Sequence, residues 1–264
     1  MNTSVQSQPK KLTESHVLIT GGTAGVGLAT AIQFAEAGVK GIAINGRNEE
    51  RGEKARQEVL SRCPDANVIF IAGDSNIPAE AERVCNSAWE QFGSIEIVVN
   101  STVGPYGPTL LKDIDPKEIG TILDSQLLAP LLISRIMLPL MTKNGGGVIT
   151  NIASDAGKHT TPGETVLGAA MAGIMMFTRA MAMEVKRNGI RVNVITPSII
   201  EGTLTNQAVM NQPFGQKLFS KAIEAARLGV VLPEDMADMI VFLSSEKAGK
   251  VTGQMISVNG GISA

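Results

Sequence analysis

Three glycines at a fixed spacing are the first feature of the chain that could bind a ligand. Gly21, Gly25 and Gly27 follow an apolar run and precede a helix-like stretch. In such a turn the first glycine permits a tight bend, the second lets the backbone approach a pyrophosphate, and the third lets the helix pack closely. A helix N-terminus adds free N–H groups and partial positive charge. The turn predicts dinucleotide binding; a purely architectural turn is the alternative.

The residues after the second apolar run bear on which dinucleotide would bind. An acid at this place normally holds the adenine ribose of NAD. The run Ile44-Asn45-Gly46-Arg47-Asn48 has none, and Arg47 could pair with a 2′-phosphate. NADP is therefore favoured over NAD. The alternative is that Arg47 is a surface residue paired with Glu50 or Glu53.

The elements that position the turn alternate between short apolar runs and helical stretches, which predicts a parallel sheet covered on both faces. We expect a single domain over residues 1–264, an α/β doubly wound (Rossmann) sheet of about seven parallel strands. The predicted strands are Val17–Thr20, Gly41–Asn45, Val68–Ala72, Ile95–Asn100, Val148–Ile152, Arg191–Ile195 and Met255–Val258. The predicted helices are Gly25–Ala37, Glu49–Arg62, Glu80–Phe92, Pro116–Met141, Thr165–Arg187 and Glu234–Leu243. One or two short helices over a cleft are expected within Glu201–Leu228.

Composition excludes several classes of protein. Of 264 residues 44% are apolar and 18% charged, which argues for a packed core and against disorder. The 23 basic and 25 acidic residues give a net charge of −2, so charge offers no reason to expect nucleic acid or a membrane as partner. The two cysteines, Cys63 and Cys85, lack metal-ligand spacing; we expect reduced thiols and no metal.

Two segments bear on localisation. The stretch Met1–Lys11 is polar and has no apolar run of the kind found in signal peptides. The apolar segment Leu127–Met141 contains Arg135 and two prolines and is expected to be too short to span a bilayer. The sequence therefore predicts a soluble, cytoplasmic protein.

Nearly the whole chain resembles the classical short-chain dehydrogenase/reductase family. The resemblance rests on several short motifs that occur in the family's order. They are Thr20-Gly21-x-x-x-Gly25-x-Gly27, Asp74, Asn100, Asn151-Ile152-Ala153-Ser154, Ile190-Arg191-Val192-Asn193, Val251-Thr252-Gly253-Gln254 and Val258-Asn259-Gly260-Gly261. The resemblance implies that Gly21, Gly25, Gly27, Arg47, Asp74 and Asn100 would contact any bound NAD or NADP.

The catalytic positions depart from the family's pattern. Such enzymes use a Ser, a Tyr thirteen residues later as acid and base, a Lys four residues further on, and an Asn that holds a relay water. Here Ser154 is present, but Leu167 stands for the Tyr, Met171 for the Lys and Gln126 for the Asn. Ser154 is then a remnant. Val103 and Ser198 also replace two glycines near the expected cofactor channel, so NAD or NADP is expected to bind weakly or not at all.

Other residues could in principle supply a proton. Tyr106, the sole tyrosine, follows the fourth predicted strand, in a loop that would border the substrate pocket. Lys158 and His159 lie soon after Ser154, but roles in loop solubility or capping are the stronger interpretation. His16, before the first strand, is expected to be structural.

These observations predict a non-catalytic subunit that pairs with an active paralogue in a hetero-oligomer, a tetramer of closed symmetry. The segment Thr165–Arg187 is rich in small residues and methionines, which suits an adaptable helix interface; core filling by the methionines is the alternative. The resemblance implies that this helix and the preceding one form the main dimer face. The pattern is similar to the paired active and inactive subunits of the hydroxyacyl-CoA dehydrogenase of anaerobic toluene degradation. An active NAD(P)-dependent oxidoreductase with a relocated acid such as Tyr106, and a dinucleotide- or small-molecule-binding sensor, are the other two hypotheses.

Overall fold

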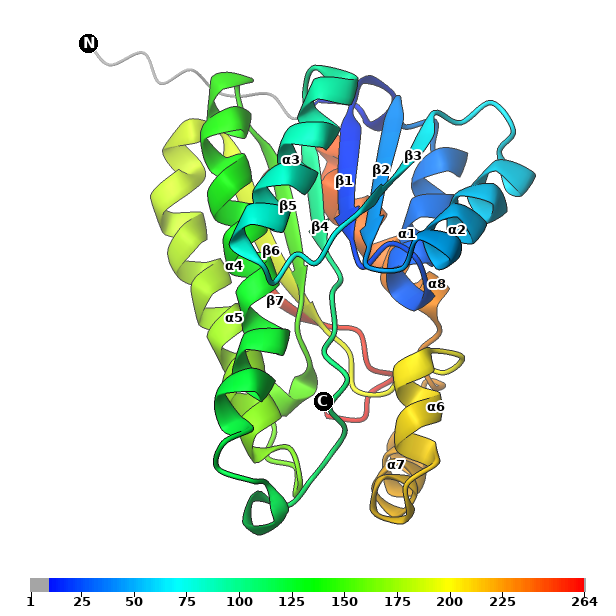
Figure 1. The fold of residues 1–264 in the computed structure, drawn as a ribbon, viewed down its shortest axis with the longest axis vertical. Coiled ribbons are helices and arrows are strands. Elements are labelled where there is room, and N and C mark those ends of the chain that lie inside the picture. The colour runs from blue at the N-terminus through cyan, green and yellow to red at the C-terminus, as the bar shows by residue number, and fades with distance from the viewer. Residues whose placement is uncertain (1–9, 264) are drawn as a thin grey trace.

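The computed structural model describes residues 10–263, and the ends of the predicted domain, including Met1–Pro9, lie outside them. Seven parallel strands form one sheet in the order β3-β2-β1-β4-β5-β6-β7 (Figure 1). The predicted doubly wound α/β class is confirmed. The strands are β1 (His16–Thr20), β2 (Gly41–Gly46), β3 (Val68–Ala72), β4 (Ile97–Asn100), β5 (Gly147–Ile152), β6 (Ile190–Thr196) and β7 (Met255–Ser257).

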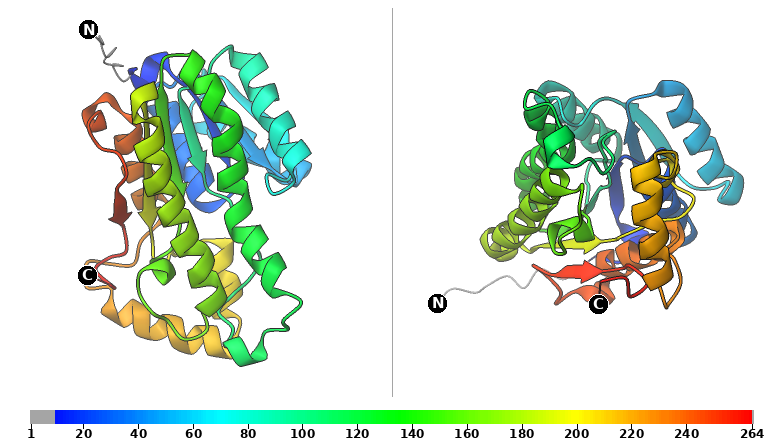
Figure 2. Two further views of the ribbon diagram at one scale, coloured as in Figure 1. Left: turned by 90° about the vertical axis from the view of Figure 1, so that its left-hand side faces the viewer. Right: turned by 90° about the horizontal axis from the view of Figure 1, so that it is seen from below.

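Helices cover both faces of the sheet, and two more close its carboxyl edge. One face carries α1 (Gly25–Glu36), α2 (Glu49–Arg62) and α8 (Pro233–Ser244). The other carries α3 (Pro78–Phe92), α4 (Ile119–Lys143) and α5 (Thr165–Val185). The short helices predicted within Glu201–Leu228 are α6 (Leu204–Met210) and α7 (Pro213–Ala225), which lie beyond the strand ends (Figure 2).

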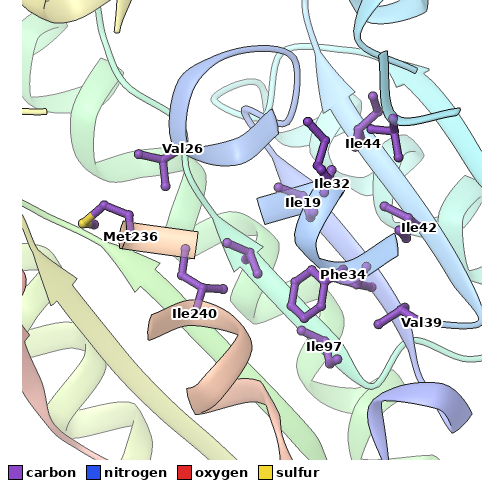
Figure 3. Close-up of a cluster of buried hydrophobic side chains, with 14 of the residues drawn as sticks. Ile19, Val26, Ile32, Phe34, Val39, Ile42, Ile44, Ile97, Met236 and Ile240 are labelled. Atoms are coloured by element: carbon purple, nitrogen blue, oxygen red, sulfur yellow. The ribbon is translucent and has the colours of Figure 1, made fainter. Parts of the chain in front are cut away.

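The core explains why the apolar runs become strands. All five residues of β1 are buried, because helices cover both of its faces, and the same holds for most of β2 and β6. Phe34 of α1 and Ile240 of α8 pack with Ile42 and Ile97 of the sheet (Figure 3). Buried apolar surface contributes roughly 25 cal/mol per Å², so this continuous cluster contributes strongly to stability.

Several boundaries differ from the sequence prediction. β4 begins at Ile97 instead of Ile95, and α4 begins at Ile119, three residues after Pro116. α3 begins earlier than predicted, at Pro78, since proline suits a first helical position where no N–H partner is needed.

The expectation that the apolar segment Leu127–Met141 is too short to span a bilayer was wrong, because the segment belongs to a longer apolar helix. Because the helix continues through Pro130 and Pro139, α4 has 25 residues, and both it and the α5 segment Thr165–Asn188 are long and apolar enough to cross a membrane. Their buried sides pack on the sheet, with Ile133 and Met137 of α4 beside Met181 of α5 in one core cluster. The two helices are therefore layers of a soluble Rossmann-type domain.

A buried polar ladder ties the strands together beneath the glycine turn. Asn100 is 2% exposed, and its amide donates to the Asn151 side-chain oxygen at 2.8 Å. Asn151 in turn donates to the Thr178 hydroxyl of α5 at 2.8 Å, and Thr20 donates to Asn100 at 3.4 Å. The ladder fixes β1, β4, β5 and α5 relative to one another at the edge where their carboxyl ends meet.

We expect Asn100→Leu to lower the free energy of unfolding by about 1–3 kcal/mol, because it leaves the Thr20 and Asn151 polar groups buried without partners. Urea unfolding followed by circular dichroism measures the change. Asn67→Leu, at an exposed position, is the control and should change little. Equal effects of the two substitutions would contradict a stabilising role for the ladder.

Candidate ligand-binding cleft

A cavity of about 480 Å³ opens at the carboxyl edge of the sheet. It lies where the strand order reverses between β1 and β4, the place at which open α/β sheets bind ligands. Its walls come from the glycine turn, the ends of β2 and β5, the loop after β4, the first turns of α5, and the segment 197–209 that leads into α6.

The glycine turn has the conformation that the sequence predicts. Gly21 and Gly25 have φ values of +67° and +50°, which favour glycine. A Cβ at Gly21 would collide with the Ser101 carbonyl after β4, and one at Gly27 would collide with the Gly21 carbonyl. Gly21 and Gly25 line the cavity, whereas Gly27 serves close packing of α1 on the turn.

The segment before α6 lies over the turn. A Cβ built on Gly25 would be 3.3 Å from the Thr203 methyl group. The Thr203 hydroxyl is occupied, since it donates to the Ile200 carbonyl and accepts from the Asn206 N–H. The Thr203 methyl group therefore narrows the space beside Gly25.

Arg47 lies at the cavity mouth beside Asp74, with a nitrogen–oxygen distance of 3.8 Å. No pairing with Glu50 or Glu53 is found among the described residues: Glu53 instead pairs with Arg56 at 2.7 Å. Asp74 is also held by the Asn76 N–H. Asn100 does not line the cavity, so it can influence a ligand only by positioning the strands.

The α5 side of the cavity contains the positions that depart from the family. Leu167 and Met171 line the wall together with Ser154, whose hydroxyl oxygen accepts from the Ala156 N–H at 3.2 Å. Met171 is 6% exposed and packs with Ala153 and Ile174 in a small apolar cluster. This part of the wall offers neither a proton donor at 167 nor a cation at 171.

Gln126 of α4 also lines the cavity and is 2% exposed. Its side-chain oxygen accepts from the Gly104 N–H at 3.2 Å, which fixes the amide, while its Nε2 has no hydrogen-bond partner among the described residues. Leaving such a donor unpaired costs about 1–3 kcal/mol. The nitrogen has almost no accessible surface, so no ligand in the cavity reaches it without movement of the loop after β4.

Val103 and Ser198, which stand where the family has glycines, line the cavity as well. Val103 is 55% exposed, so its bulk projects into open space at the mouth. Tyr106 lines the same cavity, with no cation beside it in the described lining. The two lining cations, Arg47 and Arg51, lie at the end formed by the glycine turn and β2.

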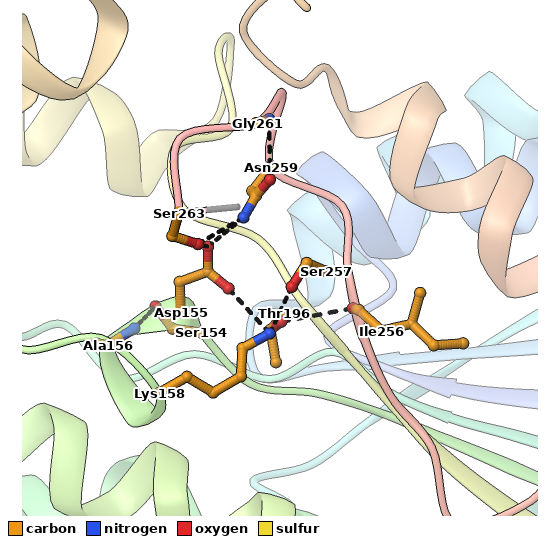
Figure 4. Close-up of polar contacts among 10 residues, drawn as sticks. All are labelled: Ser154, Asp155, Ala156, Lys158, Thr196, Ile256, Ser257, Asn259, Gly261 and Ser263. Carbon is orange, nitrogen blue, oxygen red and sulfur yellow. Dashed lines mark hydrogen bonds and ion pairs between the residues drawn. The ribbon is translucent and has the colours of Figure 1, made fainter. Parts of the chain in front are cut away.

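Lys158 and His159 do not line the main cavity. Lys158 donates to the Ser257 hydroxyl at 2.5 Å and lies 3.4 Å from Asp155, so it helps to hold the C-terminal segment (Figure 4). His159 lines a second cavity of about 240 Å³ behind Ser154. His16 is far from both: it stacks on Phe92 and lies 3.4 Å from Glu96, and burial lowers its pKa. Its predicted structural role is confirmed.

Asp155 is the centre of a polar cluster that the sequence analysis missed. Its carboxylate accepts from Asn259 at 2.6 Å and from Ser263 at 2.5 Å (Figure 4). Burial alone would raise the pKa of Asp155, but these hydrogen bonds and the charge of Lys158 lower it overall. The cluster attaches the C-terminal segment to the loop after β5.

Glu164 is a second residue that the sequence analysis missed. It lines both cavities, directly before the first residue of α5. Burial raises its pKa, a hydrogen bond with Thr161 opposes this, and the nearby charge of Asp155 adds to the rise. The sequence did offer a signal for Glu164: it precedes Leu167 by three residues and Met171 by seven, a spacing that places side chains on one helix face.

Among residues 10–263 no group of three His, Cys, Asp or Glu side chains is arranged to hold a metal ion. Both cysteines are free thiols, and burial raises the pKa of Cys85 to about 12.

Fold and cleft together are those of a Rossmann-type α/β domain, and comparison with known proteins identifies the family. The family described as enoyl-(acyl carrier protein) reductase matches residues 21–263. An uncharacterized oxidoreductase of Thermotoga maritima is 32% identical over 252 residues, covering 94% of this chain and 97% of that protein. The 3-oxoacyl-(acyl-carrier-protein) reductase FabG of Chlamydia muridarum is 32% identical over 251 residues, covering 95% and 98%.

Solved structures of similar fold include members of the same class of enzyme. Levodione reductase superposes with a TM-score of 0.89 at 26% identity, covering 96% of this chain and 98% of that one. A short-chain type dehydrogenase/reductase from Mycobacterium ulcerans gives a TM-score of 0.88 at 25% identity, covering 96% and 91%. The chain belongs to the short-chain dehydrogenase/reductase family, in which NAD(P) binding is the rule.

The Asp155 cluster generates a prediction about the C-terminal segment. Asp155→Ala removes the acceptor for Asn259 and Ser263, so amide hydrogens of residues 255–263 should exchange faster, as measured by mass spectrometry. Unfolding free energy should fall by about 1–3 kcal/mol. Asp65→Ala, at an exposed position, is the control. Unchanged exchange in Asp155→Ala would show that the segment is held by other contacts.

Proposed function

We propose that this chain is a non-catalytic subunit of a cytoplasmic heteromeric NAD(P)-dependent dehydrogenase, in which an active paralogue carries out the reaction. The observation that carries the proposal is the apolar wall made by Leu167 and Met171 beside Ser154. Proton transfer to a substrate oxygen needs a titratable group within hydrogen-bond reach, and its loss costs about 10²–10⁴ in rate.

Cofactor positioning is weakened together with proton transfer. Met171 cannot hydrogen-bond a ribose, Thr203 lies over Gly25, and Arg47 is already beside Asp74. Glu164 and Tyr106 could each hold a proton, but neither supplies the cation that would fix a nicotinamide ribose. These features support weak dinucleotide binding.

The outer face of α5 supports the partner role. Five of its eight exposed residues recur every three or four positions and form one stripe, the α5 stripe, made of Ala169, Ala172, Met176, Ala180 and Met183. The other three exposed residues are Thr165, Arg179 and Glu184. Met176 and Met183 are 60% and 67% exposed, while Met171, Met175 and Met181 are buried. Core filling therefore accounts for three of the methionines, and two are left for an interface.

α4 and α5 lie side by side on this outer face (Figure 2, left). The small side chains of the α5 stripe would let a partner helix approach closely, and exposed methionines adapt to a non-identical surface. Gly173 does not belong to the stripe: a Cβ there would lie 3.3 Å from Leu127 of α4, so it serves packing within the chain.

The purified chain should give turnover near background with secondary alcohols and ketones in the presence of NADH or NADPH, because the proton donor and the ribose-binding cation are both missing. Spectrophotometry at the nicotinamide absorbance band measures this. Cofactor oxidation well above background that is abolished by Tyr106→Phe would instead establish an active enzyme with a relocated acid.

Calorimetric titration with NAD and NADP should give no binding or a dissociation constant of about 1 mM, near −4 kcal/mol. If NADP binds measurably, Arg47→Asp should remove the higher affinity for NADP relative to NAD. Micromolar affinity for either dinucleotide would contradict weak binding.

Met176→Glu should separate this chain from its paralogue, because it places a charge in the centre of a contact expected to bury more than about 1,000 Å². The complex is followed by affinity capture of the co-expressed pair and light scattering. Leu111→Glu, at a site 52% exposed outside α4 and α5, is the matched control. A complex that survives Met176→Glu and Met183→Glu would exclude the α5 stripe as the interface.

A further inference from the structure

The C-terminal segment contacts both the loop after β5 and the base of the two helices at the carboxyl edge of the sheet. These helices, α6 and α7, form a lid of residues 203–228 that contributes to the cavity wall (Figure 1). We propose that residues 258–263 are a strap that holds this lid over the cavity, with Asp155 as its anchor and Gly260 as its contact with the lid. The proposal concerns access to the cavity, so it holds whether or not the chain is catalytic.

The lid has little buried surface of its own. Val209 of α6 and Gly215 of α7 are its buried residues, and a Cβ on Gly215 would collide with the Val209 carbonyl, so the two pack on each other. Toward the rest of the chain, Val209 lies beside Gly107 and Phe214 beside Gly163, and both of these glycines belong to loops. Segments with few buried apolar contacts open at a low cost in free energy. The ends of the lid therefore decide how firmly it is held.

Two glycines flank the lid and can act as hinges. Gly202 and Gly229 have φ values of +76° and +99°, and a Cβ on either would have no atom of a packed segment within 4 Å. Glycine is therefore favoured there by backbone conformation and not by lack of space. Such positions absorb the changes in φ and ψ when a lid moves. Outside them the two ends meet in a neck, where Ile200 forms a bridge with Val231 and the Glu201 N–H donates to the Val231 carbonyl at 2.9 Å.

The strap contacts the lid at the second of these hinges. The Leu228 N–H donates to the Gly260 carbonyl at 3.1 Å, and a Cβ on Gly260 would collide with the Gly229 carbonyl. The Leu228 side chain is 87% exposed, so apolar burial does not hold this end of the lid. The backbone contact with Gly260 therefore restricts movement at Gly229.

Asn259 joins this contact to the anchor. Its Nδ2 donates to Asp155 at 2.6 Å, and its side-chain oxygen accepts from the Gly261 N–H at 3.0 Å (Figure 4). Ser263 donates to the same carboxylate oxygen of Asp155 at 2.5 Å. Asp155 and Asn259 are only 4% and 6% exposed, so water does not readily replace these hydrogen bonds. One buried carboxylate thus fixes the turn that contains Gly260.

Movement of the lid changes the cavity on the side of the glycine turn. Thr203, the first residue of the lid, lies beside Gly25, and Leu204, Asn206 and Phe219 of the lid also line the cavity. When the strap is in place these side chains narrow the opening. When it is released, rotation about the two hinges moves them away from the turn and widens the cavity.

Hydrogen–deuterium exchange of the full-length chain, read by mass spectrometry, tests the strap. Asp155→Ala removes the anchor, which lies outside the lid, and amides of residues 204–225 should exchange about tenfold or more faster, the effect of losing a hydrogen bond to a charged group. Glu96→Ala is the matched control, since Glu96 is also a buried carboxylate and accepts from Lys10 and Asn144 at the opposite edge of the sheet. It should leave exchange in the lid unchanged. Equal acceleration of the lid in both variants, or none in Asp155→Ala, would overturn the proposal.

A second pair of substitutions acts at the other end of the strap and decides the matter if Asp155→Ala does not fold. Gly260→Ala places a methyl group against the Gly229 carbonyl while the Asp155 anchor remains. Exchange should accelerate in the lid but not in residues 155–158. Gly93→Ala, at the end of α3, has a similar φ of +75° with no packed atom within 4 Å of a Cβ, so it controls for backbone strain alone. An unchanged lid in Gly260→Ala, or the same acceleration in Gly93→Ala, would contradict the strap.

Discussion

The close approach of two backbone segments at the strand-order reversal is the constraint on which the cleft depends. The glycine turn after β1 rests against the backbone after β4, with no room for a Cβ at Gly21. Beneath them, Asn100 connects to Asn151 and so to α5. The ladder and the turn together hold the cavity open between α5 and the segment that leads to α6. Because this constraint involves backbone, buried amides and threonine hydroxyls, it does not depend on the residues at positions 154, 167 and 171.

That independence explains how the chain can keep its fold while its cavity changes in character. Leu167 and Met171 fill an apolar cluster with Ala153 and Ile174, so their substitution for polar groups is compatible with core packing. The face of α5 toward the cavity now presents one carboxyl and two apolar side chains. The opposite face presents small residues and two exposed methionines. One helix thus separates a cavity wall without the family's catalytic groups, on its inner face, from the proposed assembly surface on its outer face.

Much of this could be read from the sequence, because strong periodic patterns and backbone geometry determine it. Continuous apolar runs predicted the strands, and the spacing of Gly21, Gly25 and Gly27 predicted the turn. The pairing of Arg47 with Asp74, the cluster around Asp155 and the unpaired amide of Gln126 could not be predicted, since each depends on side chains brought together from distant segments. The packing role of Gly173 could not be predicted for the same reason: the sequence shows a small residue but not the Leu127 side chain, which lies 3.3 Å from a Cβ built on it.

The most direct test of the central claim is native mass spectrometry of the assembly isolated through this chain from the cells that produce it. The account predicts a closed hetero-oligomer in which the second chain is a family member that retains the Ser, Tyr and Lys of the active site. A homo-oligomer of this chain alone, together with unchanged activity of the paralogue when this chain is deleted, would contradict it.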